Sequence, residues 1–195
     1  MAAQKVTPAG YQLKIALQEI EPPIWRRIQV PGTMLLCCLH DALQAVMGWT
    51  DSHLHQFEKD GKFWGVPEND EFDELDLIDE SKVKLSEMLK VEGESMVYVY
   101  DFGDNWRHEV VLEKIVSPGE PPNKPICLGG ERRCPPEDVG GVNGYEEFLE
   151  AIIDPNHEEY EAMVTWAGGH FHDTLDVKAA NATLTRMRWP VRHRR

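Results

Sequence analysis

Two histidines, His53 and His55, have a spacing that could serve metal chemistry. They are two residues apart in a stretch expected to be a strand, so both imidazoles would lie on one face, where they could share a metal ion. The pair alone is weak evidence, because metallohydrolases need further ligands and no Asp-His pair follows. A second pair, His170 and His172 beside Asp173, lies in a glycine-led loop where simple exposure is the alternative. His53 and His55 are therefore the candidate metal ligands.

A second group of polar residues surrounds the turn of an expected hairpin. The segment YDFGDNWRH, which ends at His108, joins two runs rich in β-branched and aromatic residues. With a four-residue loop at 103–106, Asp101 would lie opposite His108 across the two strands, with Asp104 in the turn. We predict a cross-strand contact between Asp101 and His108. It would either stabilise the fold as a polar network or form an acid/base or metal site.

Two arginines could join this contact. In the expected strand 24–30, Arg26 shares one face with apolar residues and Arg27 lies on the other face. At least one guanidinium should therefore point into an apolar layer, where it would need a carboxylate partner. We predict that Arg26 or Arg27 attaches to the contact of Asp101 and His108.

The segment PPEDVGG forms a loop ahead of an expected helix. Its Glu137 and Asp138 could present carboxylates to a cation. Alternatively, Asp138 caps a turn and the glycines supply positive φ angles. The complete candidate polar cluster for binding consists of Arg26, Arg27, Asp101, Asp104, His108, Glu137 and Asp138.

The four cysteines favour packing over metal binding. Cys37 and Cys38 are adjacent in an apolar helical pattern, where free cysteine behaves as a small buried hydrophobe. Cys127 and Cys134 are farther apart than the paired ligands of common zinc knuckles, and no second close pair completes four ligands. A structural zinc ion at Cys127 and Cys134 is the alternative.

The pattern of apolar residues places strands first and helices last. The expected strands are 11–17, 24–30, 51–59, 62–66, 96–102 and 107–116. Expected helices include one that ends at Gly48 and three that begin near Asn143, His157 and Asp176. Residues 117–141, rich in Pro and Gly, should form a loop without regular elements. The prediction is an α+β fold: an antiparallel sheet built from hairpins, with one N-terminal helix packed on it and a C-terminal group of helices.

Length and composition predict one domain over residues 1–195, with a core at about 10–187 and a basic tail at 188–195. The longest apolar run, 34–39, is far shorter than the roughly 20 residues of a membrane span. The N-terminus lacks the pattern of a signal peptide. We therefore expect a cytoplasmic protein without membrane contact.

The formal charge of −14 argues against a broad nucleic-acid surface, because phosphate binding depends on Lys and Arg. Arginines concentrate at 186–195, which is expected to be a solvated end, with contact to nucleic acid or an acidic partner as the alternative. The segment 68–80, dominated by Asp and Glu, should be an acidic surface loop.

Three segments in order carry a family resemblance: PIWRRI (23–28) leading to MGWTDSHLHQF (47–57), YDFGDNWRH (100–108) and PPEDVGGVNGY (135–145). In that order they resemble the plasmid pRiA4b ORF-3-like family over nearly the whole chain. The resemblance implies an α+β domain of bacterial or archaeal type and no established reaction. Some members carry resolvase-like or repressor-like names. A resolvase of the tyrosine type would need a tyrosine that attacks a phosphodiester, and none follows the Arg-His-Arg sequence at 192–194. No helix-turn-helix, as expected of a repressor, is evident either. At 169–176 the chain departs from the family's Phe-Asp-Pro-like stretch.

Two classes of function remain open. No complete catalytic constellation can be assembled from spacing, which favours a non-catalytic module that binds a protein or a small ligand. The alternative is a metal-dependent hydrolase or nuclease that uses a divalent ion at the candidate residues His53, His55, Asp101, Asp104 and His108. A weaker possibility is a DNA-associated accessory protein of mobile elements, acting through the arginine-rich tail.

Overall fold

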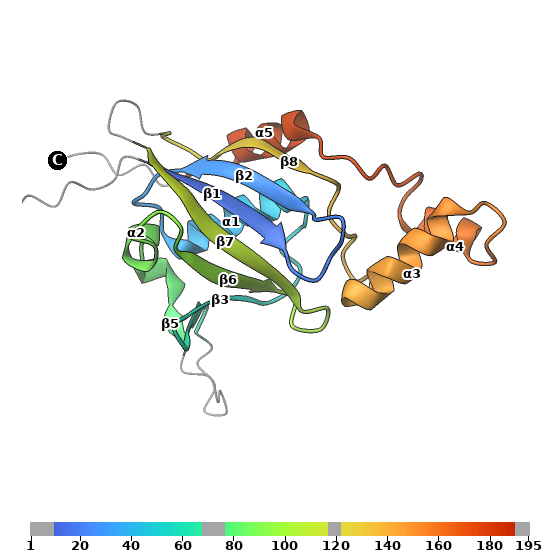
Figure 1. Ribbon diagram of the computed structural model, residues 1–195, viewed down its shortest axis with the longest axis horizontal. Helices are drawn as coiled ribbons and strands as arrows, with labels where there is room; N and C mark the ends of the chain where they lie inside the picture. Colours follow the sequence, from blue (N-terminus) through green and yellow to red (C-terminus); the bar gives the residue numbers. More distant parts are fainter. Residues whose placement is uncertain (1–9, 68–76, 117–121, 190–195) are drawn as a thin grey trace, which may run out of the picture.

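The computed structural model describes residues 10–67, 77–116 and 122–189, and is built around one eight-stranded sheet (Figure 1). The strand order is β5-β4-β3-β6-β7-β1-β2-β8, and every neighbouring pair is antiparallel except the parallel pair β4 and β5. The strands are β1 (Gly10–Leu17), β2 (Trp25–Val30), β3 (His55–Lys59), β4 (Lys62–Gly65), β5 (Ile78–Asp79), β6 (Ser95–Tyr100), β7 (Trp106–Val116) and β8 (Ile126–Glu131). The mixed helix and strand content and the mostly antiparallel sheet match the prediction.

Five α-helices and one 3-10 turn accompany the sheet in the described residues. They are α1 (Leu36–Met47), η1 (Glu80–Lys82), α2 (Leu85–Met88), α3 (Gly141–Ile153), α4 (Tyr160–Trp166) and α5 (Val177–Arg186). None of them is long and apolar enough to span a membrane. Residues 68–76 of the acidic segment and 190–195 of the basic tail lie outside the described residues.

Helix α1 packs against one face of the sheet. Its Leu36, Leu39 and Leu43 are fully buried, as are Leu13 and Ile15 of β1. Apolar residues recur at every second position in β1 and at every third or fourth position in α1, so each element presents an apolar face to the other. Burial of each Leu or Ile side chain contributes roughly 1.5–3 kcal/mol to the stability of the fold. The sheet face opposite to α1 is polar and carries the ion pairs between Arg27 and Glu113 and between Arg107 and Glu58.

Two predicted hairpins are confirmed. Strands β3 and β4 join through Asp60 and Gly61, both with positive φ, which is the backbone of a tight type I′ turn. Strands β6 and β7 pair antiparallel as expected. The prediction that 117–141 lacks regular elements is wrong, because residues 126–131 pair with β2 as the edge strand β8. A strand beside Pro and Gly is tolerated at an edge, where only one side of the backbone needs partners.

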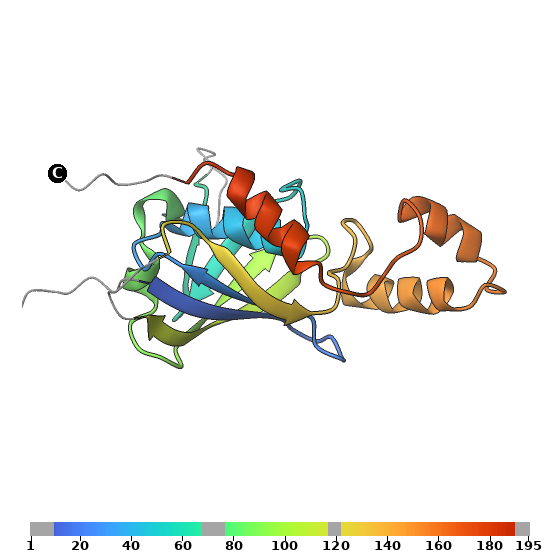
Figure 2. The ribbon, with the colours of Figure 1, turned by 90° about the horizontal axis from the view of Figure 1, so that it is seen from above.

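The C-terminal helices occupy two places. Helices α3 and α4 contact each other and extend beyond the end of the sheet, away from α1 (Figures 1 and 2). The chain then returns, and α5 lies against α1 and β8 (Figure 2). Asp176 caps α5 as predicted, since its side chain accepts a hydrogen bond from the backbone N–H of Ala179. Helix α3 begins at Gly141, two residues before the predicted start at Asn143.

Candidate metal centre

The candidate site is an open groove of about 640 Å³ beside α1, β3 and η1. The stretch between α1 and β3 supplies Asp51 and His53 to its wall, and β3 itself supplies His55. Helix α1 contributes His40, and η1 contributes Glu80. The groove therefore collects three imidazoles and several carboxylates.

His53 lines one end of the groove, and three carboxylates that are not part of the groove wall converge on its ring. Its Nε2 atom lies 3.0 Å from Asp138 Oδ1, 3.6 Å from Asp101 Oδ2 and 3.6 Å from Glu137 Oε2. The carboxylates come from two separate segments, the β6–β7 turn and the loop before α3. In the described residues, no Lys, Arg or other His lies within ion-pair distance of Asp101, Glu137 or Asp138.

Two of these carboxylates are held by hydrogen bonds, Asp101 through Oδ1 only and Glu137 through both oxygens. Asp101 Oδ1 accepts the backbone N–H of Gly103 at 2.9 Å, which leaves Oδ2 toward His53. Glu137 Oε1 accepts the backbone N–H of Thr50 at 2.6 Å, which leaves Oε2 toward His53. Tyr100 donates to the Glu137 carboxylate at 3.2 Å. Outer contacts that fix one oxygen and direct the other are the arrangement that orients metal ligands.

The Nε2 atom of His53 is buried and has no hydrogen-bond partner in the described residues. Its 3.0 Å separation from Asp138 Oδ1 satisfies an ion-pair distance, but the directions do not form a hydrogen bond. The contact is therefore electrostatic without being a hydrogen bond, because a hydrogen bond weakens steeply away from linearity. A nitrogen that faces carboxylate oxygens without donating to them is suited to a cation between these groups.

The donor set fits a divalent ion. One imidazole nitrogen and up to three carboxylate oxygens suit zinc, manganese or iron, and the carboxylates alone would suit magnesium. Asp101 and Asp138 both have left-handed backbones, with φ of 56° and 59°. Such conformations are uncommon for residues other than glycine and concentrate at functional sites.

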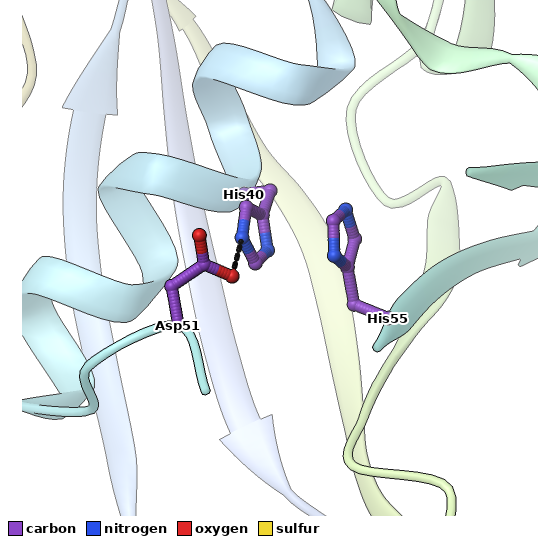
Figure 3. Close-up of side chains that lie close together, drawn as sticks. All are labelled: His40, Asp51 and His55. Carbon is purple, nitrogen blue, oxygen red and sulfur yellow. Dashed lines mark hydrogen bonds and ion pairs between the residues drawn. The ribbon is translucent and has the colours of Figure 1, made fainter. Parts of the chain in front are cut away.

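The other end of the groove holds a stacked pair of histidines (Figure 3). The rings of His40 and His55 lie 3.5 Å apart and are parallel to within 7°. His40 Nε2 lies 2.9 Å from Asp51 Oδ1, and His55 Nε2 lies 3.0 Å from Glu80 Oε2. Each imidazole therefore has its own carboxylate.

This stacking argues against one ion shared by His40, Asp51 and His55, although their ligand atoms lie within 4.8 Å of one another. A ring nitrogen offers its lone pair in the plane of the ring, so an ion between two parallel rings would lie out of at least one plane. The pKa of His40 is lowered to about 4, mainly by burial and also by the neighbouring His55, whereas Asp51 opposes the shift. The Tyr98 hydroxyl lies 2.8 Å from His40 Nδ1. A polar pair that holds α1 against the sheet is the simpler interpretation.

The predicted contact between Asp101 and His108 is wrong. In the actual register Tyr98 lies opposite His108 and Tyr100 lies opposite Trp106, so Asp101 falls inside the turn. The turn comprises five residues, with Asp101 in the left-handed region. His108 is fully buried beneath α1, where its Nδ1 atom lies 3.2 Å from the carbonyl oxygen of Tyr98.

The two arginines do not join Asp101 either. Arg26 is buried and donates to the carbonyl oxygens of Val46, Trp25 and Glu131 and to the thiol of Cys134. The expected carboxylate partner for the buried guanidinium is thus replaced by neutral acceptors in the described residues. Arg27, on the polar face of the sheet, pairs with a carboxylate, Glu113 Oε2, at 2.6 Å.

Of the predicted polar cluster, Asp101, Glu137 and Asp138 come together, with His53 from the predicted metal pair. Asp104 lies beside them and accepts the backbone N–H of Gly140 at 3.2 Å, which ties the β6–β7 turn to the loop before α3. Gly141 permits this approach, because a Cβ atom there would lie 2.7 Å from the backbone oxygen of Asp104.

Sequence reasoning missed His40, Asp51 and Glu80. A signal existed for His40, which is four residues after Leu36 and so lies on the buried stripe of α1. Glu80 belongs to the acidic segment and was expected on the surface, but it is 3% exposed. Its burial depends on the packing of η1 against α1, which local sequence does not reveal.

Comparison with known proteins places the chain in a family. Residues 9–179 match the model of the plasmid pRiA4b ORF-3-like protein family. The chain is 40% identical over 164 residues to the "Uncharacterized protein y4hQ" of Sinorhizobium fredii, covering 84% of this chain and 83% of the relative. A crystal structure described as "Protein of Unknown Function MM3350 from Methanosarcina mazei Go1" matches with a TM-score of 0.78 and 45% identity, over 87% of this chain and 95% of that chain. The chain therefore belongs to the plasmid pRiA4b ORF-3-like family.

Proposed function

We propose that the protein is a binding module for a divalent metal ion, held by His53, Asp101, Glu137 and Asp138. The observation that carries the proposal is the buried, unbonded Nε2 atom of His53, with carboxylate oxygens of three residues within 3.6 Å. Without a cation, three carboxylates this close would repel one another, and no Lys or Arg of the described residues pairs with them. A divalent ion would relieve this repulsion and provide His53 with a partner.

The test is metal content followed by metal-dependent stability. Protein purified without a tag or chelator should contain metal in elemental analysis, or should bind added Mn²⁺ or Zn²⁺ in calorimetry. At a metal concentration about 100 times Kd, binding stabilises the native state by about 2.7 kcal/mol. For a chain of this length that corresponds to an increase in Tm of roughly 5–11 °C.

Matched variants separate this site from adventitious binding. His53→Gln and Asp101→Asn should each remove most of the metal-dependent increase in Tm. Two exposed residues outside the groove, His170 and Glu146, provide the controls His170→Gln and Glu146→Gln, which should keep it. The proposal fails if the wild type binds neither metal, or if the site variants bind as tightly as the controls.

A metal-dependent hydrolase is the second candidate. The observation that favours it is that His55, oriented by the buried Glu80, lines the same groove as His53. A histidine held by a carboxylate is the residue type that most often accepts a proton from attacking water. Turnover of bis-p-nitrophenyl phosphate or p-nitrophenyl phosphate with added Mn²⁺ or Zn²⁺, lost in His55→Gln with metal retained, would support it. Metal binding without turnover of either ester would favour the non-catalytic module.

Other parts of the sequence interpretation stay predictions. These are the single domain with a core at about 10–187, the cytoplasmic location and a protein or small-molecule ligand for the groove. Contact with DNA through the arginine-rich tail concerns mainly residues outside the described part of the chain.

A further inference from the structure

We propose that the cleft between α3 and α4 binds a basic peptide segment of a partner protein, with one large apolar side chain of that segment inserted between the helices. Asp138 lines this cleft and is also a proposed metal ligand, but the contacts proposed here are made by side chains of α3 and α4 and need no ion. Three features of the two helices carry it: an unfilled apolar cleft, uncovered apolar residues and a one-sided charge.

The cleft has a volume of about 380 Å³. Phe148 of α3 and Met163 and Trp166 of α4 supply its apolar wall. Glu147 and Glu159 lie at its rim. An apolar pocket with a few charged groups at the edge is the arrangement that accepts an anchoring side chain of a peptide.

Apolar side chains of the two helices are left uncovered in the described structure. Helix α4 has no buried residue, and Trp166 is 48% exposed. Ile153 at the end of α3 is 82% exposed. Both helices extend away from the sheet, so α1 and α5 do not cover them (Figures 1 and 2). Trp166 borders the cleft, and an exposed aromatic residue beside an apolar cleft with charged neighbours indicates an interaction surface.

The charge of this region determines what the partner must be. From Cys134 to Val177 the sequence contains no Lys or Arg. The carboxylates in that interval are Glu137, Asp138, Glu146, Glu147, Glu150, Asp154, Glu158, Glu159, Glu161, Asp173 and Asp176. Arg132, just before this interval, pairs with Asp173, but α3 and α4 themselves carry carboxylates and no Lys or Arg. Their negative field attracts a segment rich in Lys and Arg and repels nucleic acid and acidic proteins. Apolar contacts would provide affinity, and the rim charges would provide selection and a fast approach.

A labelled synthetic peptide tests the proposal directly. The probe is KRKRWRKRK, whose central tryptophan is the anchor, and two matched peptides replace that tryptophan with glycine or all basic residues with glutamate. Fluorescence anisotropy should give binding of the first peptide, about ten-fold weaker binding of the glycine peptide, and no binding of the glutamate peptide. The first affinity should also fall as the salt concentration rises.

Variants of the protein locate the contact. Trp166→Ala should weaken binding of the tryptophan peptide about ten-fold, and so should the double variant Glu147→Lys, Glu159→Lys. The controls are Leu128→Ser, another exposed apolar residue, and Glu109→Lys, another exposed carboxylate, both in the sheet. Circular dichroism of each variant checks that the fold is retained, and all titrations are repeated with EDTA.

The outcomes discriminate clearly. Loss of affinity in the α3–α4 variants alone, with or without EDTA, supports the proposal. Equal binding of the tryptophan and glycine peptides, or equal weakening by Glu109→Lys, would mean general charge attraction and would overturn it. So would an absence of binding at low salt. Binding that requires metal would place the contact in the groove of His53 and would also overturn it.

Discussion

The buried histidine His108 should make the fold sensitive to mild acid. The pKa of His108 is lowered from an ordinary value of 6.5 to about 4, mainly by burial and also by the charge of Arg26, although backbone hydrogen bonds to Tyr98 and Trp106 oppose the shift. Between pH 6.5 and pH 4 the unfolded chain therefore binds a proton at this residue that the folded chain does not bind. Stability contributed by the neutral imidazole is complete above pH 6.5 and is lost as the pH falls toward 4.

The size of this effect follows from the two pKa values. Lowering the pH from 7 to 5 should reduce the free energy of unfolding by about 2 kcal/mol through His108 alone. His40, whose pKa is also lowered to about 4, should contribute a similar loss. Wild type would then lose roughly 4 kcal/mol over this interval, a large fraction of the 5–15 kcal/mol typical of a domain.

Urea unfolding at pH 7, 6 and 5 measures the loss. The variant His108→Gln cannot take up a proton, so we expect it to lose about 2 kcal/mol less than wild type between pH 7 and 5, whatever its stability at pH 7. The exposed His170 provides the control His170→Gln, which should follow wild type. If His108→Gln and wild type lose the same free energy, the imidazole is not held neutral by burial and the reasoning is refuted.

Three further substitutions have outcomes that follow from named contacts. Arg26→Met leaves buried carbonyl oxygens without donors, so the urea midpoint should report a loss of about 3 kcal/mol or more, with Arg26→Lys restoring part of it. Gly144→Ala would bring a Cβ atom within 2.0 Å of the backbone oxygen of Val139, so we expect a cost of about 1–3 kcal/mol and a smaller metal-dependent increase in Tm, because the loop of Asp138 must shift. Removing both Arg27 and Glu113, a partly exposed pair, should show a coupling energy below about 1 kcal/mol in a double-mutant cycle.

The elements of the sheet were predictable where local pattern determines them. Alternation identified β1 and β2, and Asp60 with Gly61 identified the turn between β3 and β4, because that turn needs positive φ angles. Strand β8 was not predictable in the same way. It forms because β2 offers an unpaired edge, and that edge exists only once the rest of the sheet is assembled.

The candidate site was predictable as a set of residues but not as an arrangement. Asp101, Glu137 and Asp138 were predicted as members of one polar cluster and His53 as a metal ligand, but nothing in the sequence joined His53 to Glu137 or Asp138. The error at Asp101 has a clear cause: the turn lies at 101–105 rather than 103–106, which shifts the register by three residues, so that Tyr98 rather than Asp101 faces His108. The carboxylates near His53 are far from it in the sequence. Their approach depends on how the β6–β7 turn and the loop before α3 pack together, which local sequence does not predict.

The backbone at these loops strengthens the case for function over simple fold stabilisation. Asp51, Asp101 and Asp138 all adopt left-handed conformations, with φ between 56° and 59°, and all three carboxylates lie within reach of a groove histidine. Each such conformation costs of order 1 kcal/mol for a residue other than glycine. Asp60 has the same conformation in the β3–β4 turn, so the conformation alone does not identify a site; Asp51, Asp101 and Asp138 differ from it in that each carboxylate faces a histidine of the groove. Asp51 belongs to the polar pair with His40 that holds α1 against the sheet, whereas Asp101 and Asp138 both face the unbonded Nε2 atom of His53, which supports a role for their carboxylates at that histidine.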